Sequence, residues 1–170
     1  MFKDEFTILK FPKDYQVGWL SEINRKRNQY DKDVFYVDAI GQVSVPSDIS
    51  LMLNVNSQSA ASMRWLTEIE STQLKQLYLG QTGINNENIQ YISHLINLEE
   101  LSFCHVYENI NDLGTHYLKP LINMRKLYLN STNSGGRKNY VTLKGIEGLQ
   151  NCLPECKITA CDLSYLLSDR

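Results

Sequence analysis

The sequence predicts an α/β solenoid, with a curved parallel β-sheet on its concave face, helical returns on its convex face and a cap at its N-terminal end. Two observations predict this class. A phrase of the form Leu-x-x-Leu-x-Leu recurs along the second half of the chain, and segments whose apolar residues are three apart separate its copies. Because one short strand cannot bury its apolar side alone, stacked copies would join their leucines into one continuous core.

The recurring phrase has four copies, of which the last is the weakest. They are Leu74-x-x-Leu77-x-Leu79, Leu98-x-x-Leu101-x-Phe103, Met124-x-x-Leu127-x-Leu129 and Leu153-x-x-Cys156-x-Ile158. The steps between their middle positions are 24 (77 to 101), 26 (101 to 127) and 29 (127 to 156). Leu53 and Val55 lie 24 residues before Leu77 and Leu79, so they belong to a first, degenerate copy. In each copy the last two apolar positions are two apart, as in a strand with one inward face.

Apolar residues three apart predict a helical return between successive strands, with one face directed at the core. These residues are Met63, Leu66 and Ile69; Ile89, Ile92 and Leu95; Leu118 and Leu121; and Ile146 and Leu149. Pro120 lies late in the third return, where a proline predicts a short or broken helix.

The domain organisation follows from where the phrase occurs. Residues 1–48 lack it and are predicted to form an N-terminal capping region. About five repeats, the first and last degenerate, occupy residues 49–160, and residues 161–170 form a C-terminal cap.

Within the N-terminal region the patterns are weaker. Phe6–Phe11 is predicted to be a strand, and alternation at Val43 and Val45 predicts another after a turn at Gly41. The segment 15–30 has a helical spacing of apolar residues that includes Trp19, Leu20 and Ile23, and Asp14 is placed to cap that helix. The run Arg25-Lys26-Arg27 is interpreted as the solvated end of this helix rather than as a nucleic-acid patch, because acidic residues surround it.

The phrase resembles the repeat of short bacterial leucine-rich repeat proteins, which reads Leu-x-x-Leu-x-Leu-x-x-Thr-x-Ile. The matching residues are Leu74, Leu77, Leu79, Thr82 and Ile84, then Met124, Leu127, Leu129 and Thr132, and the ending Leu153-Pro154-Glu155-Cys156-Lys157-Ile158. The resemblance covers residues 49–160 and implies that the concave face binds another macromolecule. The middle copy departs from the pattern, since Val106 replaces the Thr and its loop is longer.

Composition excludes several classes of function. The 170 residues are 42% hydrophobic and 21% charged with a net charge of -2, so the chain can bury a core and has no bulk attraction to nucleic acid or to an anionic membrane. No apolar run approaches the roughly 18 residues of a membrane helix. The first residues do not resemble a secretory signal, so we expect a cytoplasmic protein with reduced cysteines.

The strand register predicts which side chains face outward on the concave face. The candidate contact residues are Asn54, Gln76, Tyr78, Glu100, Ser102, Lys126, Tyr128 and Lys157. Lys157 is placed in the same row as Tyr78, Ser102 and Tyr128. The two tyrosines are predicted to be binding hot spots on either side of a shallow gap over Ser102, although tyrosine also simply suits strands.

Two loops that follow strand ends are candidate contact loops on one edge of the predicted stack. The first carries His105 and Tyr107, and the second carries Arg137 and Lys138. The alternative is that the second is an ordinary solvated loop.

Catalytic and metal-binding patterns are not found in the sequence. Cys152, Cys156 and Cys161 lack the paired spacing of a zinc site. Cys104 and His105 are neighbours on a strand, so their side chains would point to opposite faces. We therefore expect no cofactor and no metal, and a hydrolase would need a pocket that an open sheet does not supply.

Together these observations predict a non-enzymatic module that binds another protein and is a monomer on its own. An inhibitor or immunity-type protein and an adaptor are the narrower versions of this hypothesis. The alternative is a structural subunit that docks through its ends or its convex side. The identity of the partner is not encoded in any of these patterns.

Overall fold

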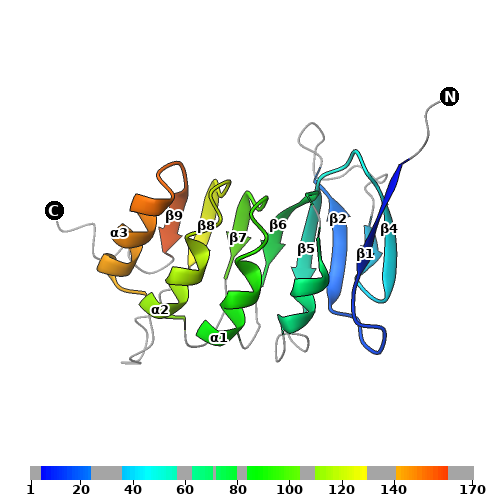
Figure 1. Ribbon diagram of the computed structural model, residues 1–170, viewed down its shortest axis with the longest axis horizontal. Coiled ribbons are helices and arrows are strands. Elements are labelled where there is room, and N and C mark those ends of the chain that lie inside the picture. The colour runs from blue at the N-terminus through cyan, green and yellow to red at the C-terminus, as the bar shows by residue number, and fades with distance from the viewer. Residues whose placement is uncertain are drawn as a thin grey trace.

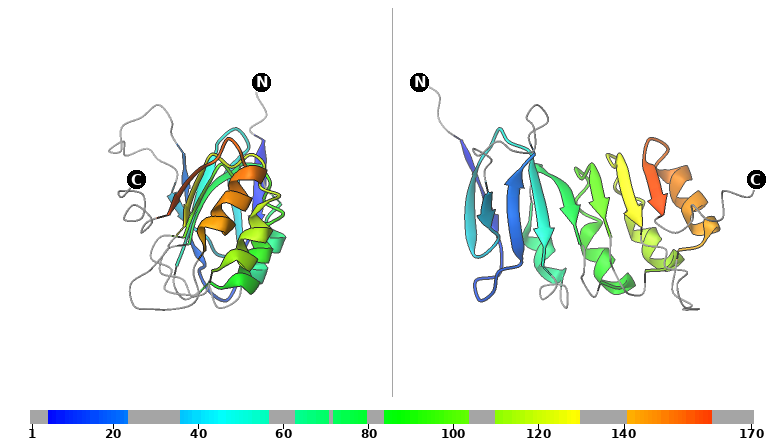
Figure 2. Two further views of the ribbon diagram at one scale, coloured as in Figure 1. Left: turned by 90° about the vertical axis from the view of Figure 1, so that its left-hand side faces the viewer. Right: turned by 180° about the vertical axis from the view of Figure 1, so that it is seen from behind.

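The computed structural model describes residues 5–23, 36–56, 63–70, 72–79, 84–103, 110–129 and 141–160. Successive elements follow one another along the long axis, and the helices lie on one face of the main sheet (Figures 1 and 2). The strands are β1 (Phe6–Lys10), β2 (Gly18–Glu22), β3 (Tyr36–Asp38), β4 (Gln42–Pro46), β5 (Leu51–Val55), β6 (Leu74–Tyr78), β7 (Glu100–Ser102), β8 (Lys126–Leu129) and β9 (Lys157–Ala160). The helices are α1 (Asn86–Ile89), α2 (Asp112–Thr115), α3 (Leu143–Cys152) and the 3-10 helices η2 (Met63–Glu68), η3 (Gln90–Ile92) and η4 (His116–Leu118).

The predicted solenoid is wrong, because the fold is mixed α/β. The main sheet has seven strands in the order β3-β2-β5-β6-β7-β8-β9, and β1 and β4 form a separate two-stranded sheet. β2 pairs antiparallel with both β3 and β5, whereas the pairs from β5 to β9 are parallel. The chain is therefore not a uniform stack of one strand–helix unit, since four strands before β5 pair antiparallel.

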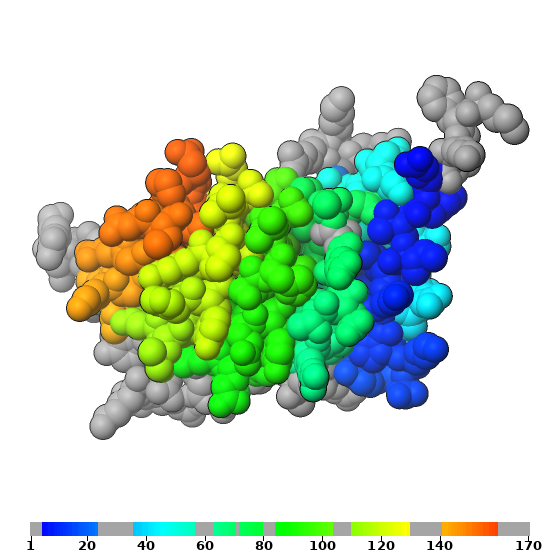
Figure 3. All heavy atoms as spheres, viewed as in Figure 1, coloured from blue at the N-terminus to red at the C-terminus, as the bar shows by residue number. Residues whose placement is uncertain are grey.

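The leucines of the recurring phrase pair as their spacing predicts. Leu53, Leu77, Leu101 and Leu127 are partners in successive parallel strands, and each is 0% exposed. Leu20 of β2 continues this row on the other side of Leu53. The row forms the centre of a core that lies between the sheet and the helices, and Figure 3 shows the successive segments of the chain as adjacent bands on the helical side.

The last copy of the phrase is shifted relative to the prediction. Ile158, not Cys156, pairs with Leu127. The amide of Cys156 donates to the carbonyl of Leu153, the same i−3 turn in which Leu98 donates to Leu95 and Met124 to Leu121. Cys156 therefore occupies the first position of the phrase, because it closes the turn that precedes the strand in the earlier copies.

The helix predicted over residues 15–30 is wrong where the structure describes the segment. Gly18–Glu22 is β2, held between β3 and β5. The backbone of β2 packs closely on β5 at Gly18, where a Cβ would collide with the backbone of Asn54 and Val55. Residues 24–30, including the basic run at 25–27, lie outside the described residues.

The predicted strands at Phe6–Phe11 and around Val43 and Val45 are confirmed as β1 and β4, which pair antiparallel. Gly41 forms the predicted turn before β4 with a φ of 61°, a conformation that favours glycine. Leu9 and Val45 face the core from this two-stranded sheet. The β1–β4 strand pair thus covers the N-terminal end of the core, while the predicted boundary at residue 48 stays a prediction.

The returns are shorter and less regular than the predicted helices. α1 and α2 have four residues each and continue as 3-10 turns, and the helical segment of the third return ends at Leu118, just before Pro120, as the proline predicts. Among the α-helices of the described segments only α3, with 10 residues, is longer, and the 3-10 helix η2 has six residues. None of the helices in these segments is long and apolar enough to cross a membrane.

Polar side chains link the starts of successive helices. The side chain of Asn85 accepts hydrogen bonds from two amides of α1, and Asn111 does the same for one amide of α2. Asn86 donates to the Asn111 side chain at 2.9 Å. Asp112 accepts from the amide and hydroxyl of Thr142, the N-cap of α3, at 2.8 and 2.7 Å. These bonds fix the spacing of the returns because each cap is tied to the preceding helix.

Candidate binding face

Two rows of side chains face away from the helices along the seven-stranded sheet, and we call this surface the outer face. They flank the central row of core residues, and side chains alternate between the faces of a strand. The first row is Tyr36, Ser21, Met52, Gln76, Glu100, Lys126 and Lys157. The second row is Asp38, Trp19, Asn54, Tyr78, Ser102, Tyr128 and Thr159.

Seven of the eight predicted face residues stand in the rows that the sequence register assigns to them. The exception is Lys157, which pairs with Lys126 in the first row, whereas Thr159 pairs with Tyr128. The reason is that Cys156 belongs to the turn before β9, so Ile158, two residues later than predicted, pairs with Leu127. The two exposed lysines therefore lie side by side and form a positive end of the first row.

Glu100 is the centre of a hydrogen-bonded cluster rather than a free contact residue. Its side chain accepts from the Tyr78 hydroxyl at 2.7 Å, the Lys126 ammonium at 3.3 Å and the Gln76 amide at 3.4 Å. The residue is only 8% exposed. A buried carboxylate needs such charged and polar partners, because losing water without replacing its hydrogen bonds is costly. Glu100 thus fixes the orientation of Tyr78.

Ser102, a predicted contact residue, is itself buried, and the predicted gap over it stays a prediction. It is 3% exposed and lies between Tyr78 and Tyr128 in the second row. Both tyrosines are half-buried. A partner would therefore meet the tyrosine rings rather than the serine, because a small side chain between two larger ones lies below the surface they form.

Trp19 and Tyr36 belong to the outer face and were missed by the sequence reasoning. Their ring centroids are 6.5 Å apart, and Tyr36 is 62% exposed. Trp19 was assigned to a helix, so its neighbours across the sheet were not predicted. The preference of Trp and Tyr for strands is the only local signal that favours their actual location.

Alternating charges line the edge of the sheet where the parallel strands begin. Lys75 lies 3.9 Å from Glu99, and Arg125 lies 3.8 Å from Glu155. Lys75, Glu99 and Arg125, together with two asparagines, line a polar cleft of about 360 Å³. The Arg125–Glu155 pair is exposed and contributes little to stability, whereas the Lys75–Glu99 pair is half-buried. Their main effect is to alternate the sign of charge from one strand to the next.

The predicted loop contacts His105, Tyr107, Arg137 and Lys138 lie outside the described residues, as do Cys104 and Cys161. In the described residues no group of three or more His, Cys, Asp or Glu side chains is arranged to hold a metal ion. Cys152 is exposed and Cys156 is buried, and neither forms a disulfide. Burial raises the pKa of the Cys156 thiol from 9.0 to about 11, so this thiol stays protonated and packs as a small apolar group.

No protein-family model matches the chain, and no match is found among curated proteins. The resemblance to leucine-rich repeat proteins therefore stays a prediction from the residues that carry it.

Proposed function

We propose that the protein is a non-enzymatic module that binds another protein on the outer face. The observation that carries this proposal is the pair of side-chain rows on one face of the sheet, which hold Trp19, Tyr36, Tyr78 and Tyr128 over a rigid core. Tyr and Trp are the residues most enriched at binding hot spots, since each presents a large ring and a polar group at a low cost in side-chain entropy.

The chemistry of the face suggests which part of it contributes most to binding. Tyr78 is tied to Glu100, so its ring is held in place before a partner arrives. Such preorganisation lowers the entropy lost on binding. Lys126 and Lys157 extend the face with positive charge, and Asp38 lies at the opposite end of the second row. A partner surface with apolar residues at its centre and acidic residues at one end would complement this arrangement.

A second candidate function, a structural subunit of an assembly, is favoured by one observation on the helical side. Leu113, Ile122 and Leu143 are large apolar residues that are 73%, 70% and 49% exposed. Exposed apolar residues are common singly, so they support docking only if they form a contact together. Light scattering on the purified chain tests this candidate: an oligomer that Leu113→Ser and Ile122→Ser convert to monomer would favour assembly over the outer face.

We infer a cytoplasmic location from the sequence, and the unpaired thiols of Cys152 and Cys156 fit that inference. We also keep the expectation that the chain functions without a cofactor and is a monomer before it binds. Fractionation of the native cell, with detection of this chain in each fraction, tests the location.

The experiment for the main proposal measures partner affinity for variants of the outer face. The partner is first isolated on the immobilised chain from the native host, and its dissociation constant is then measured by calorimetry. Tyr128→Ala and Tyr36→Ala are each expected to weaken binding by about 30-fold, which corresponds to about 2 kcal/mol for a hot spot. Tyr78→Phe removes the hydroxyl that donates a hydrogen bond to Glu100. It is expected to weaken binding less than the alanine variants do, because the ring stays.

Tyr117→Ala is the matched control. This tyrosine lies in η4 on the helical side and is 41% exposed, so its loss removes a comparable ring from the opposite surface. If the control weakens binding and the two outer-face variants leave it within about twofold, the partner binds elsewhere and the proposal is wrong.

A further inference from the structure

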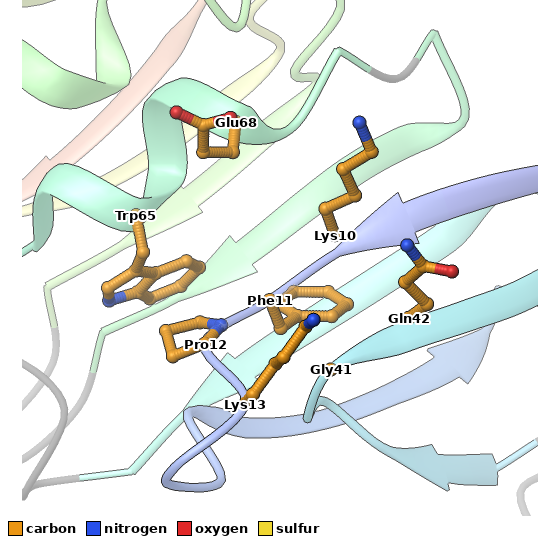
Figure 4. A pocket seen from close by; sticks show the side chains of 8 residues that line it. All are labelled: Lys10, Phe11, Pro12, Lys13, Gly41, Gln42, Trp65 and Glu68. Atoms are coloured by element: carbon orange, nitrogen blue, oxygen red, sulfur yellow. The ribbon is translucent and has the colours of Figure 1, made fainter.

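A second surface that could take a ligand lies at the N-terminal end of the molecule, on different elements from the outer face residues discussed above. It is a cleft of about 290 Å³ between the β1–β4 strand pair and η2. Figure 4 shows its lining side chains, which come from the end of β1, the turn before β4 and the 3-10 helix. These three segments are far apart in the chain, with more than 50 positions between Phe11 and Trp65.

The floor of the cleft is aromatic and apolar. Phe11 and Trp65 have ring centroids 6.1 Å apart at an angle of 52°, and Pro12 follows Phe11 along the wall. Phe11 is 6% exposed and Trp65 is 7% exposed, so the rings are anchored in the core and offer only part of their surface. An apolar side chain entering the cleft would therefore meet rigid rings that lose little entropy on binding.

The rim of the cleft carries an excess of positive charge. Lys10 and Lys13 are exposed and line the cleft, and Glu68 is the acidic residue on the η2 side. No ion pair within the described segments involves either lysine. Two lysines against one glutamate favour a ligand with carboxylates next to its apolar group, because opposite charges attract and like charges on a ligand would be repelled.

An exposed apolar strip leads from β1 to the cleft. Phe6 and Ile8 are each 58% exposed and alternate along β1 with the same face as Lys10. Lys10 pairs with Gln42 of β4, which lines the cleft as well. The strip and the cleft thus form one surface that is longer than a small molecule, and contiguous exposed apolar residues indicate a contact with a macromolecule.

We propose that this cleft docks an acidic segment of a partner protein. One apolar side chain of that segment fills the floor between Phe11 and Trp65, carboxylates beside it face Lys10 and Lys13, and the flanking chain lies along Phe6 and Ile8. Pockets that hold whole small molecules range from about 300 to 1,000 Å³, and this cleft is at the lower limit of that range. Its volume therefore suits one apolar side chain rather than a larger ligand.

Short synthetic peptides test the proposal on the full chain by two-dimensional NMR. The probe is acetyl-Glu-Leu-Glu-amide, and the comparators are acetyl-Lys-Leu-Lys-amide and acetyl-Glu-Ser-Glu-amide. The chain has two tryptophans, Trp65 in the cleft and Trp19 on the outer face, so their indole N–H signals report the two surfaces separately. We expect the acidic leucine peptide to shift the Trp65 signal with a dissociation constant on the order of 1 mM, and the comparators to bind at least about fivefold more weakly.

Variants of the rim give effects of opposite sign. Lys10→Glu combined with Lys13→Glu is expected to weaken binding of the acidic peptide at least about fivefold. Glu68→Gln is expected to strengthen its binding. All three side chains are exposed, so these variants should fold. Lys144→Glu on α3, also exposed, reverses one lysine away from the cleft; as the control, it should leave the affinity unchanged.

Three results would overturn the proposal. One is a shift of the Trp19 indole signal rather than the Trp65 signal, which would place the peptide on the outer face. Another is equal binding of the lysine-flanked peptide, which would remove the role of charge. The third is the absence of any Trp65 shift up to about 10 mM peptide.

Discussion

At the scale of single residues, the exposure of a side chain on the outer face depends on its neighbours in adjacent strands, which lie far away in the sequence. The register places Glu100 and Ser102 on the outer face, where alternation predicts contact with solvent. In the structure both are buried, because Tyr78, Lys126 and Gln76 bond to Glu100 and two tyrosines flank Ser102. The direction of a side chain follows from the strand period, but its exposure depends on the length and pairing of side chains from adjacent strands.

Cys156 offers a test at this scale. Burial raises its pKa to about 11, so thiolate, the reactive form, is scarce at neutral pH. In a Cys104→Ser, Cys161→Ser background at pH 7.5, we expect maleimide to label exposed Cys152 within minutes and to leave Cys156 unlabelled until the chain unfolds. Peptide mapping by mass spectrometry measures both. Comparable labelling of Cys156 in the folded chain would show that its thiol is accessible.

The same shift has a consequence for stability against pH. The folded-state pKa of Cys156 lies above the usual 9.0, so the folded chain retains the proton that the unfolded chain loses. The contribution of this residue is therefore fully present below pH 9, and it decreases as the pH rises from 9 towards 11. Cys156→Ala is expected to flatten this part of the stability profile measured by urea denaturation.

At the scale of secondary structure elements, long-range pairing overrode local spacing at β2. Apolar residues around Trp19 and Leu20 have a helical spacing, yet Leu20 pairs with Leu53 and Gly18 packs closely on the backbone of β5. A helix and a strand would both bury Leu20, so periodicity over so few residues cannot distinguish the two structures. The strands β4 and β5 were predictable because their apolar residues alternate, and β1 because it is rich in apolar residues and precedes Pro12.

The short α-helices of the returns are stabilised by their linked N-caps. A helix of four residues cannot be stable through its own hydrogen bonds. Thr142 accepts from the amide of Gly145 at 3.1 Å and donates to Asp112 at 2.7 Å, so it joins α3 to α2.

Thr142→Ala removes both of these bonds and is expected to lower the free energy of unfolding by about 1 kcal/mol, as for a typical N-cap. Thr142→Ser is the matched control, because serine keeps the hydroxyl that makes both bonds. Urea denaturation followed by circular dichroism measures the difference. An equal loss in the alanine and serine variants would mean that the methyl group, not the cap, stabilises α3.

At the scale of the whole molecule, the N-terminal region is joined to the rest by a continuous sheet. β2 pairs with β5 over five register positions, from Gly18 with Val55 to Glu22 with Leu51, and the β1–β4 strand pair covers the end of the core. Without β2, the edge of β5 would present unpaired backbone groups and the apolar residues Leu51 and Leu53 would gain exposure.

A chain of residues 49–170 is therefore expected to aggregate or to lack a cooperative thermal transition. Circular dichroism and light scattering compare it with the full chain at equal concentration. A monomeric fragment whose melting temperature lies within about 5 °C of that of the full chain would mean that residues 1–48 are a dispensable cap.

The parallel pairing of β5 to β8 was predictable from the sequence, because the period of the leucines is a local property that repeats. Leu77 and Leu101 pair as their spacing predicts, and Tyr78 and Tyr128 occupy one row. Other features depend on the three-dimensional packing. The antiparallel strands β2 and β3, the shifted β9, the burial of Glu100 and the cleft between Phe11 and Trp65 all depend on segments far apart in the chain. Pairing and packing between such segments are set by the shape of the whole core, which no window of sequence contains.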